Sequence, residues 1–205
     1  MRLSTINSNK FHDADYYICQ KIFYKGEYNI SFSCYHYAFM NSETPYMAAL
    51  NLLQKFKSAY YYKAYNYIIN HYNEFGIYMS EFKGLGYELL LILAKSYEAK
   101  IVDIDRNVYP NAKYEFMTLD KILKNKKDVP EYIYQQALYS MDKLLKIMKD
   151  HEEYVAQFYK RTNKQNANKL RIEYKEIVAK HLEKFKIEKT EYEAKMADSK
   201  FILDF

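Results

Sequence analysis

The chain has 205 residues, a net charge of +5 and 49% hydrophobic residues, enough to bury a core without disulfides or metal. This composition excludes general disorder, and four glycines with three prolines are too few for the successive turns of a β-sandwich or β-barrel. Acidic and basic residues are interleaved along the chain, as on solvated helix faces, so we expect no nucleic-acid partner.

Helical periodicity follows a short polar lead-in at residues 1–12, and residues 13–205 are predicted to form one all-α domain. The predicted helices span residues 13–24, 28–40, 45–55, 60–73, 78–100, 112–125, 131–149, 151–161, 165–181 and 187–202. The predicted connections carry the breakers Gly26, Pro45, Gly76, Pro110 and Pro130. Each proline is placed to open the next helix, because its missing N–H would be unpaired there in any case.

One spacing recurs along the chain: a large apolar residue, a small residue, two variable residues and another large residue. It occurs at residues 18–22, 93–97 and 155–159, with Cys19, Ala94 and Ala156 as the small residues. A small residue lets a neighbouring helix approach closely while the flanking large residues, such as Ile18, fill the groove between the helices. This is the arrangement in the first helix of a tetratricopeptide (TPR) unit of about 34 residues. The spacing predicts about five stacked helix pairs in a right-handed superhelix.

The second helix of each predicted unit contributes to the same pattern. Tyr35 and Ala38 fall on the inner face of the second helix in the first unit, after a turn at Gly26. Ala64 and Ile68 are the main marks of a degenerate second unit. We therefore expect these residues to pack between helices.

No arrangement of residues indicates catalysis, a cofactor or a metal site. His151 and Glu152 could begin the zinc motif H-E-x-x-H, but position 155 is a valine. The sequence Gly84-Leu85-Gly86 follows no predicted strand, so it is not a nucleotide-binding fingerprint. We expect a protein that is not an enzyme.

The two cysteines and the most apolar segment bear on the compartment. Cys19 and Cys34 have neither metal-ligand nor redox spacing and do not suggest a disulfide framework, and their redox state stays open. Residues 89–94 are apolar but far too few to span a bilayer, and the N-terminus has no apolar signal core. We expect the chain as written to be soluble.

Two further stretches carry more specific motifs. Residues 95–107 read KSYEAKIVDIDRN, and residues 151–161 read HEEYVAQFYKR, with Arg171 in the next predicted helix. The first is similar to a repeat helix ending in SYY that is followed by a D-x-D-R-D loop. The second closely resembles the helix motif HE-x-x-VA-x-FY-x-(K/R), and Arg171 matches the arginine of an R-G-A-Y stretch that follows this motif. Both motifs, in this order, resemble the BamD-type outer-membrane assembly lipoproteins.

The resemblance implies a non-catalytic scaffold at the periplasmic face of the bacterial outer membrane, with no cofactor. Residues 13–100 would bind unfolded outer-membrane barrel proteins, and residues 101–205 would dock on the soluble domains of a BamA-type insertase. Other assembly lipoproteins are further partners within this family. Membrane attachment would need a lipid anchor that this sequence lacks, because no cysteine precedes Cys19.

The resemblance also assigns residues. Arg171 would form a salt bridge to the insertase, the alternative being a solvated surface arginine. An arginine beside two carboxylates favours ion pairs over a cation site, so a loop-fixing role is expected for Asp103, Asp105 and Arg106. The predicted client groove comprises Tyr17, Tyr24, Tyr46 and Tyr62, for which packing in the repeat core is the alternative.

Two rival functions stay open. A soluble, cytoplasmic TPR adaptor or chaperone-like protein would explain the missing anchor, but not the match over residues 151–171. An enzyme built on helices would need a catalytic constellation, and the sequence offers none.

Overall fold

The computed structural model describes residues 5–79, 81–101 and 108–162. This part of the chain consists of helices and their connections and contains no strand, which confirms the predicted all-α fold. The helices are α1 (Thr5–Tyr24), α2 (Tyr28–Met40), α3 (Pro45–Tyr61), α4 (Tyr65–Met79), α5 (Lys83–Glu98), α6 (Val108–Lys124) and α7 (Glu131–Thr162).

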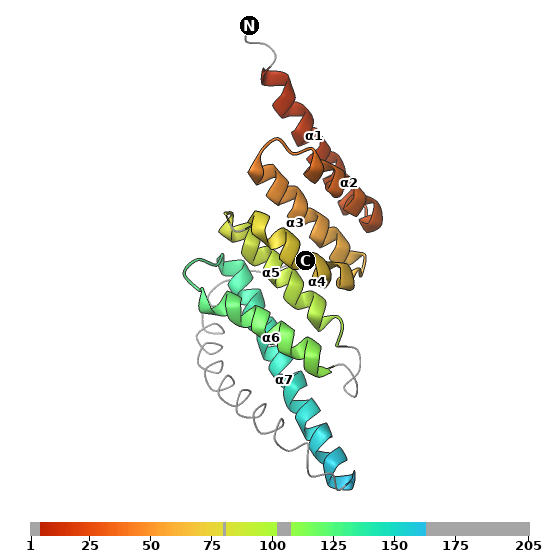
Figure 1. The fold of residues 1–205 in the computed structure, drawn as a ribbon, viewed down its shortest axis with the longest axis vertical. Helices are drawn as coiled ribbons and strands as arrows, with labels where there is room; N and C mark the ends of the chain where they lie inside the picture. The colour runs from red at the N-terminus through yellow and green to blue at the C-terminus, as the bar shows by residue number, and fades with distance from the viewer. Residues whose placement is uncertain (1–4, 80, 102–107, 163–205) are drawn as a thin grey trace.

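The helices follow one another along the long axis of the molecule, each packed against the next (Figure 1). In addition, α3 contacts α5, and α5 contacts α7, so alternate helices also lie next to one another. This pattern is expected when helix pairs stack in a row. The right-handed TPR superhelix itself stays a prediction.

Local sequence explains where the helices begin and end. Gly26, at φ +80°, closes α1 in the left-handed conformation that glycine adopts at little cost. Lys63 adopts the same region at φ +64° after α3, where the Ala64 N–H bonds to the Ala59 carbonyl at 2.8 Å. Pro45 opens α3 as predicted, and the Thr44 side chain accepts a hydrogen bond from the Met47 N–H at 3.2 Å.

Three clusters of buried side chains form the core. The largest joins α5, α6 and α7 and includes Ala94, and the second joins α3, α4 and α5 around Phe56. The third is small and consists of Cys19, Tyr35 and Ala38, between α1 and α2. Burial of these residues, Ala94 included, agrees with the predicted inner positions.

Several predicted boundaries are wrong. The helix α1 already begins at Thr5, within the predicted lead-in. The predicted helices 131–149 and 151–161 are one helix, α7, because no glycine or proline interrupts the pattern between them. Gly76 lies inside α4 rather than in a connection, a placement that costs about 1 kcal/mol relative to alanine and is outweighed by packing.

One predicted packing position is also wrong. Ile18 was expected to fill a groove between helices, but it is 53% exposed, since its neighbour Cys19 takes the inward direction. Ala64 lies in the turn between α3 and α4, where it is partly buried against the second cluster, and Ile68 is buried as expected. The side chain of Ala156, the loop residues Asp103, Asp105 and Arg106, and the predicted helices 165–181 and 187–202 lie outside the described residues.

Cys19 in α1 and Cys34 in α2 form a disulfide, with their Cα atoms 5.4 Å apart. The prediction of no disulfide framework is therefore wrong. The two residues are separated by 15 positions, and the turn at Gly26 folds the two helices together so that their side chains meet.

None of the described helices combines the length and the apolar character needed to cross a membrane.

Candidate binding groove

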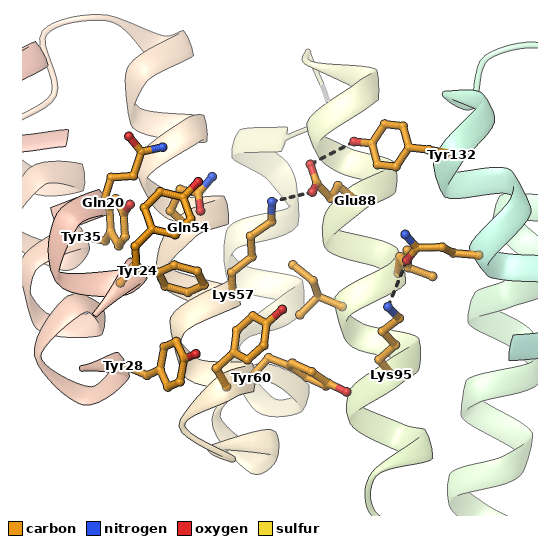
Figure 2. Close-up of a pocket in the computed structure, with 15 residues that line it drawn as sticks. Gln20, Tyr24, Tyr28, Tyr35, Gln54, Lys57, Tyr60, Glu88, Lys95 and Tyr132 are labelled. Atoms are coloured by element: carbon orange, nitrogen blue, oxygen red, sulfur yellow. Dashed lines mark hydrogen bonds and ion pairs between the residues drawn. The ribbon is translucent and has the colours of Figure 1, made fainter. Parts of the chain in front are cut away.

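A groove of about 550 Å³ runs across α1, α2, α3, α5 and α7 (Figure 2). Its walls combine aromatic rings, side-chain amides, two aliphatic residues and a few charged groups. The lining residues are Gln20, Phe23, Tyr24, Tyr28, Tyr35, Gln54, Lys57, Tyr60, Tyr61, Glu88, Leu91, Ile92, Lys95, Tyr132 and Gln136. A cavity of this size lies within the range of about 300–1,000 Å³ that is usual for ligand sites.

Helical spacing brings these residues to one face. Along α3 the lining residues Gln54, Lys57 and Tyr61 are three or four positions apart, so they share one stripe of the helix. Along α5, Glu88 and Lys95 are two turns apart and share a stripe in the same way. The other stripes of both helices carry the core residues, which fix the helices and hold this face in place.

An aromatic cluster, formed by Phe23, Tyr28 and Tyr61, lies at the α1–α3 side of the groove. The Tyr28 and Tyr61 rings are stacked, with centroids 5.0 Å apart and an interplanar angle of 22°. Phe23 meets both rings edge-on, at 5.2 Å from Tyr28 and 5.4 Å from Tyr61. These geometries are the favoured ones for aromatic pairs, and all three residues border the groove.

The charged groups of the groove are bonded within the protein. Lys57 Nζ lies 2.6 Å from Glu88 Oε1, and the Tyr132 hydroxyl donates to Glu88 Oε2 at 3.3 Å (Figure 2). Lys95 Nζ donates to the Gln136 side-chain oxygen at 3.0 Å. Burial lowers the pKa of the Lys95 ammonium, while the nearby Glu98 acts in the opposite direction.

Burial also changes the phenols that border the groove. Tyr35 is fully buried, and desolvation is the main reason that the pKa of its hydroxyl lies well above the ordinary value. Desolvation likewise raises the pKa of Tyr60 to about 12. Both phenols are therefore neutral at physiological pH and act as hydrogen-bonding groups rather than as charges.

Among the predicted groove tyrosines, only Tyr24 lines the groove, where it is 76% exposed. Tyr17, Tyr46 and Tyr62 are exposed but are not among the lining residues; Tyr46 packs edge-on against Phe82 at 5.5 Å. Since all four side chains are exposed, the alternative of packing in the repeat core is wrong for each. The structure thus brings one of the four into a site.

Sequence reasoning missed the rest of the groove. Tyr28, Tyr60, Tyr61 and Tyr132 line it, as do three glutamines. The signal that could have found these residues is their spacing of three or four positions along α3 and α5. This spacing marks a second stripe on each helix, besides the stripe that faces the core. Arg171, the predicted insertase contact, lies outside the described residues.

Comparison of the chain with models of known families, with curated proteins and with solved structures finds no match. Within residues 5–79, 81–101 and 108–162, no group of three or more histidine, cysteine or acidic side chains is placed to hold a metal ion. The observations thus define an all-α protein of stacked helices with a groove rich in aromatic rings.

Proposed function

We propose that this chain is a non-catalytic scaffold of the machinery that assembles β-barrel proteins in the bacterial outer membrane. The observation that carries the proposal is the groove across α1, α2, α3, α5 and α7, with its aromatic cluster. Tyrosine and phenylalanine supply a large contact area with few rotatable bonds, so a row of them suits an extended, unfolded client segment. In this proposal the client is an unfolded outer-membrane barrel protein.

The disulfide between Cys19 and Cys34 supports a place outside the cytoplasm. Disulfides form and persist in oxidising compartments, such as the bacterial periplasm, and are rare in the cytosol. A cytoplasmic TPR adaptor, the rival function, would hold these two cysteines as thiols. The disulfide therefore favours the periplasmic scaffold over the adaptor.

The BamD-like motifs supply the second part of the proposal, docking on a BamA-type insertase. In the first motif, Ser96 is buried and donates to the Ile92 carbonyl at 2.7 Å, and Tyr97 stacks on Tyr114 with centroids 5.5 Å apart. These contacts give that motif a structural role at the junction of α5 and α6. The second motif continues α7, and the docking contact is assigned to Arg171 by the resemblance.

Site-specific photo-crosslinking tests client binding. A photoreactive amino acid at Tyr24 or Tyr61, both in the groove, should capture a urea-unfolded outer-membrane barrel protein on dilution into buffer. The same amino acid at Tyr62, exposed but outside the groove, is the matched control and should capture little. Equal capture at Tyr62 and at the two groove positions, or capture at none of the three, would contradict the proposal.

The compartment is tested separately, by thiol alkylation of the protein in intact cells. Resistance of Cys19 and Cys34 to alkylation before reduction, together with release in the periplasmic or membrane fraction, is expected. Free thiols in a cytosolic fraction would favour the adaptor instead.

A further inference from the structure

The polar groups of the groove fall into two sets with different hydrogen bonding. Toward α5 and α7, lysine, glutamate and tyrosine side chains are bonded to one another, as described above. Toward α1, α2 and α3, the side chains of Gln20, Tyr35 and Gln54 form no hydrogen bond with any described residue. Figure 2 shows these three side chains gathered at one end of the groove. We call this end the amide subsite.

Tyr35 makes the amide subsite unusual. Its side chain is fully buried, yet its hydroxyl has no partner in the described part of the chain. A buried polar group left without a partner costs roughly 1–3 kcal/mol, and more than about 90% of such groups in proteins are paired. An orphan hydroxyl at the wall of a groove indicates that its partner arrives with whatever fills the groove.

The chemistry of the amide subsite selects the kind of group that would fill it. A glutamine side chain both donates and accepts, and a main-chain peptide group does the same, so the two pair in complementary fashion. The Tyr35 hydroxyl can donate to a carbonyl oxygen. None of these three side chains carries a charge, and the Lys57 and Glu88 charges nearby are paired at 2.6 Å. The subsite therefore matches neutral peptide groups better than acidic or basic side chains.

The aromatic cluster lies on the same side of the groove and completes the match. Phe23 is in α1, as is Gln20, and Tyr61 is in α3, as is Gln54. An extended segment held by its main chain presents alternate side chains to opposite sides. One such side chain can pack on the cluster while the neighbouring peptide groups reach the amide subsite.

We propose that Gln20, Tyr35 and Gln54 hold the main-chain peptide groups of an extended, uncharged client segment, whose apolar side chain packs on the aromatic cluster. This inference rests on the proposed function and adds which chemical groups of the client are recognised. Recognition is then largely independent of the client's charge and depends on an accessible, unpaired backbone.

The test is fluorescence anisotropy with the full, disulfide-bonded chain and a labelled, capped peptide of about ten residues, roughly 33 Å when extended. The peptide alternates threonine with tyrosine or valine and carries no charge. Tyr35→Phe removes only the hydroxyl and should weaken binding about three- to tenfold, the value of one hydrogen bond between neutral groups. Tyr46→Phe, outside the groove, is the matched control and should bind as the wild type does.

Two altered peptides separate main-chain recognition from charge recognition. N-methylation of alternate peptide nitrogens, which removes donors but no side chain, should weaken binding at least about tenfold. Aspartate in place of two threonines should not strengthen binding, and raising the salt from about 50 to about 500 mM should leave the affinity of the neutral peptide unchanged.

The outcomes distinguish this inference from the proposed function. Tighter binding of the acidic peptide, salt-sensitive binding, or equal affinities of the wild type and Tyr35→Phe would overturn the inference. In those cases, crosslinks at Tyr24 and Tyr61 would still support the groove as the client site. Failure of every peptide to bind, together with absent crosslinks, would overturn both.

Discussion

Glu115, in α6, is expected to make the protein less stable as the pH rises, and Glu115→Gln should remove that effect. The Glu115 side chain is 1% exposed, and neither carboxyl oxygen has a hydrogen-bond partner in the described part of the chain. Burial raises its pKa to about 9, the nearby Glu98 adds to the rise, and Lys143 opposes it. The carboxyl group is therefore protonated in the folded protein at pH 7.

The sign and size of the effect follow from the two pKa values. In the unfolded chain Glu115 has its ordinary pKa of 4.5, so between pH 4.5 and about 9 only the folded state binds this proton. Below pH 4.5 the ionisation of Glu115 takes nothing from the unfolding free energy. As the pH rises through this window, the unfolding free energy falls by about 1.4 kcal/mol per pH unit. At pH 7 the loss amounts to about 3 kcal/mol, and it is nearly complete at pH 9.

Urea unfolding followed by circular dichroism between about pH 5 and pH 8 measures this effect. Because glutamine is neutral and similar in shape, Glu115→Gln should gain about 2–3 kcal/mol over the wild type at pH 7, and less at pH 5. The difference between the two proteins at each pH isolates Glu115 from the other titrating groups. Glu81→Gln, at an exposed position in the connection before α5, should leave the curve unchanged. A pH-independent difference, or a variant less stable than the wild type at pH 7, would refute the reasoning.

Other changes test the hairpin, the core and the proposed docking contact. Reducing the disulfide between Cys19 and Cys34, which closes a 15-residue separation, should lower the unfolding free energy by about 3 kcal/mol in denaturant titrations with and without dithiothreitol. Ala94→Leu should cost roughly 1–3 kcal/mol by overpacking, and an unchanged thermal melt would contradict its buried position. Burial and a neighbouring lysine lower the pKa of His36, so stability should fall as the pH drops below 6.5, and His36→Gln should lack this acid loss in melting curves. Arg171→Ala should weaken binding to the soluble domains of a BamA-type insertase by about 2–5 kcal/mol in calorimetry, with an unchanged melting temperature.

The sequence predicted the helices best where a breaker residue marks their ends. The helix α2, Tyr28–Met40, has the predicted bounds, because Gly26 and Pro45 confine the possible positions on either side. The end of α3 was missed because Lys63, rather than a glycine, takes the left-handed conformation there. The break predicted in α7 between residues 149 and 151 is wrong, and no glycine or proline marks it.

The groove could be predicted only in part, for a reason that lies in the composition. With 25 tyrosines in the chain, tyrosine occurs on the core side, the groove side and the outer side of the helices alike. Tyr35 is buried, Tyr61 lines the groove and Tyr46 is exposed outside it. The residue type therefore carries little information about the face, and which stripe of each helix meets the next is decided by tertiary packing.

The disulfide connects the stability of the first hairpin with the shape of the groove. From residue 15 onward, where burial is described, few residues are buried between α1 and α2. Among them are Cys19 itself and Tyr35, whose hydroxyl borders the amide subsite. So small an apolar cluster contributes little stability, whereas a covalent link limits the freedom of the unfolded hairpin. Since Gln20, Tyr24 and Tyr35 all belong to this hairpin, the bond that holds α1 on α2 also holds one end of the groove. The disulfide thus contributes to the shape of the site as well as to the stability of the fold.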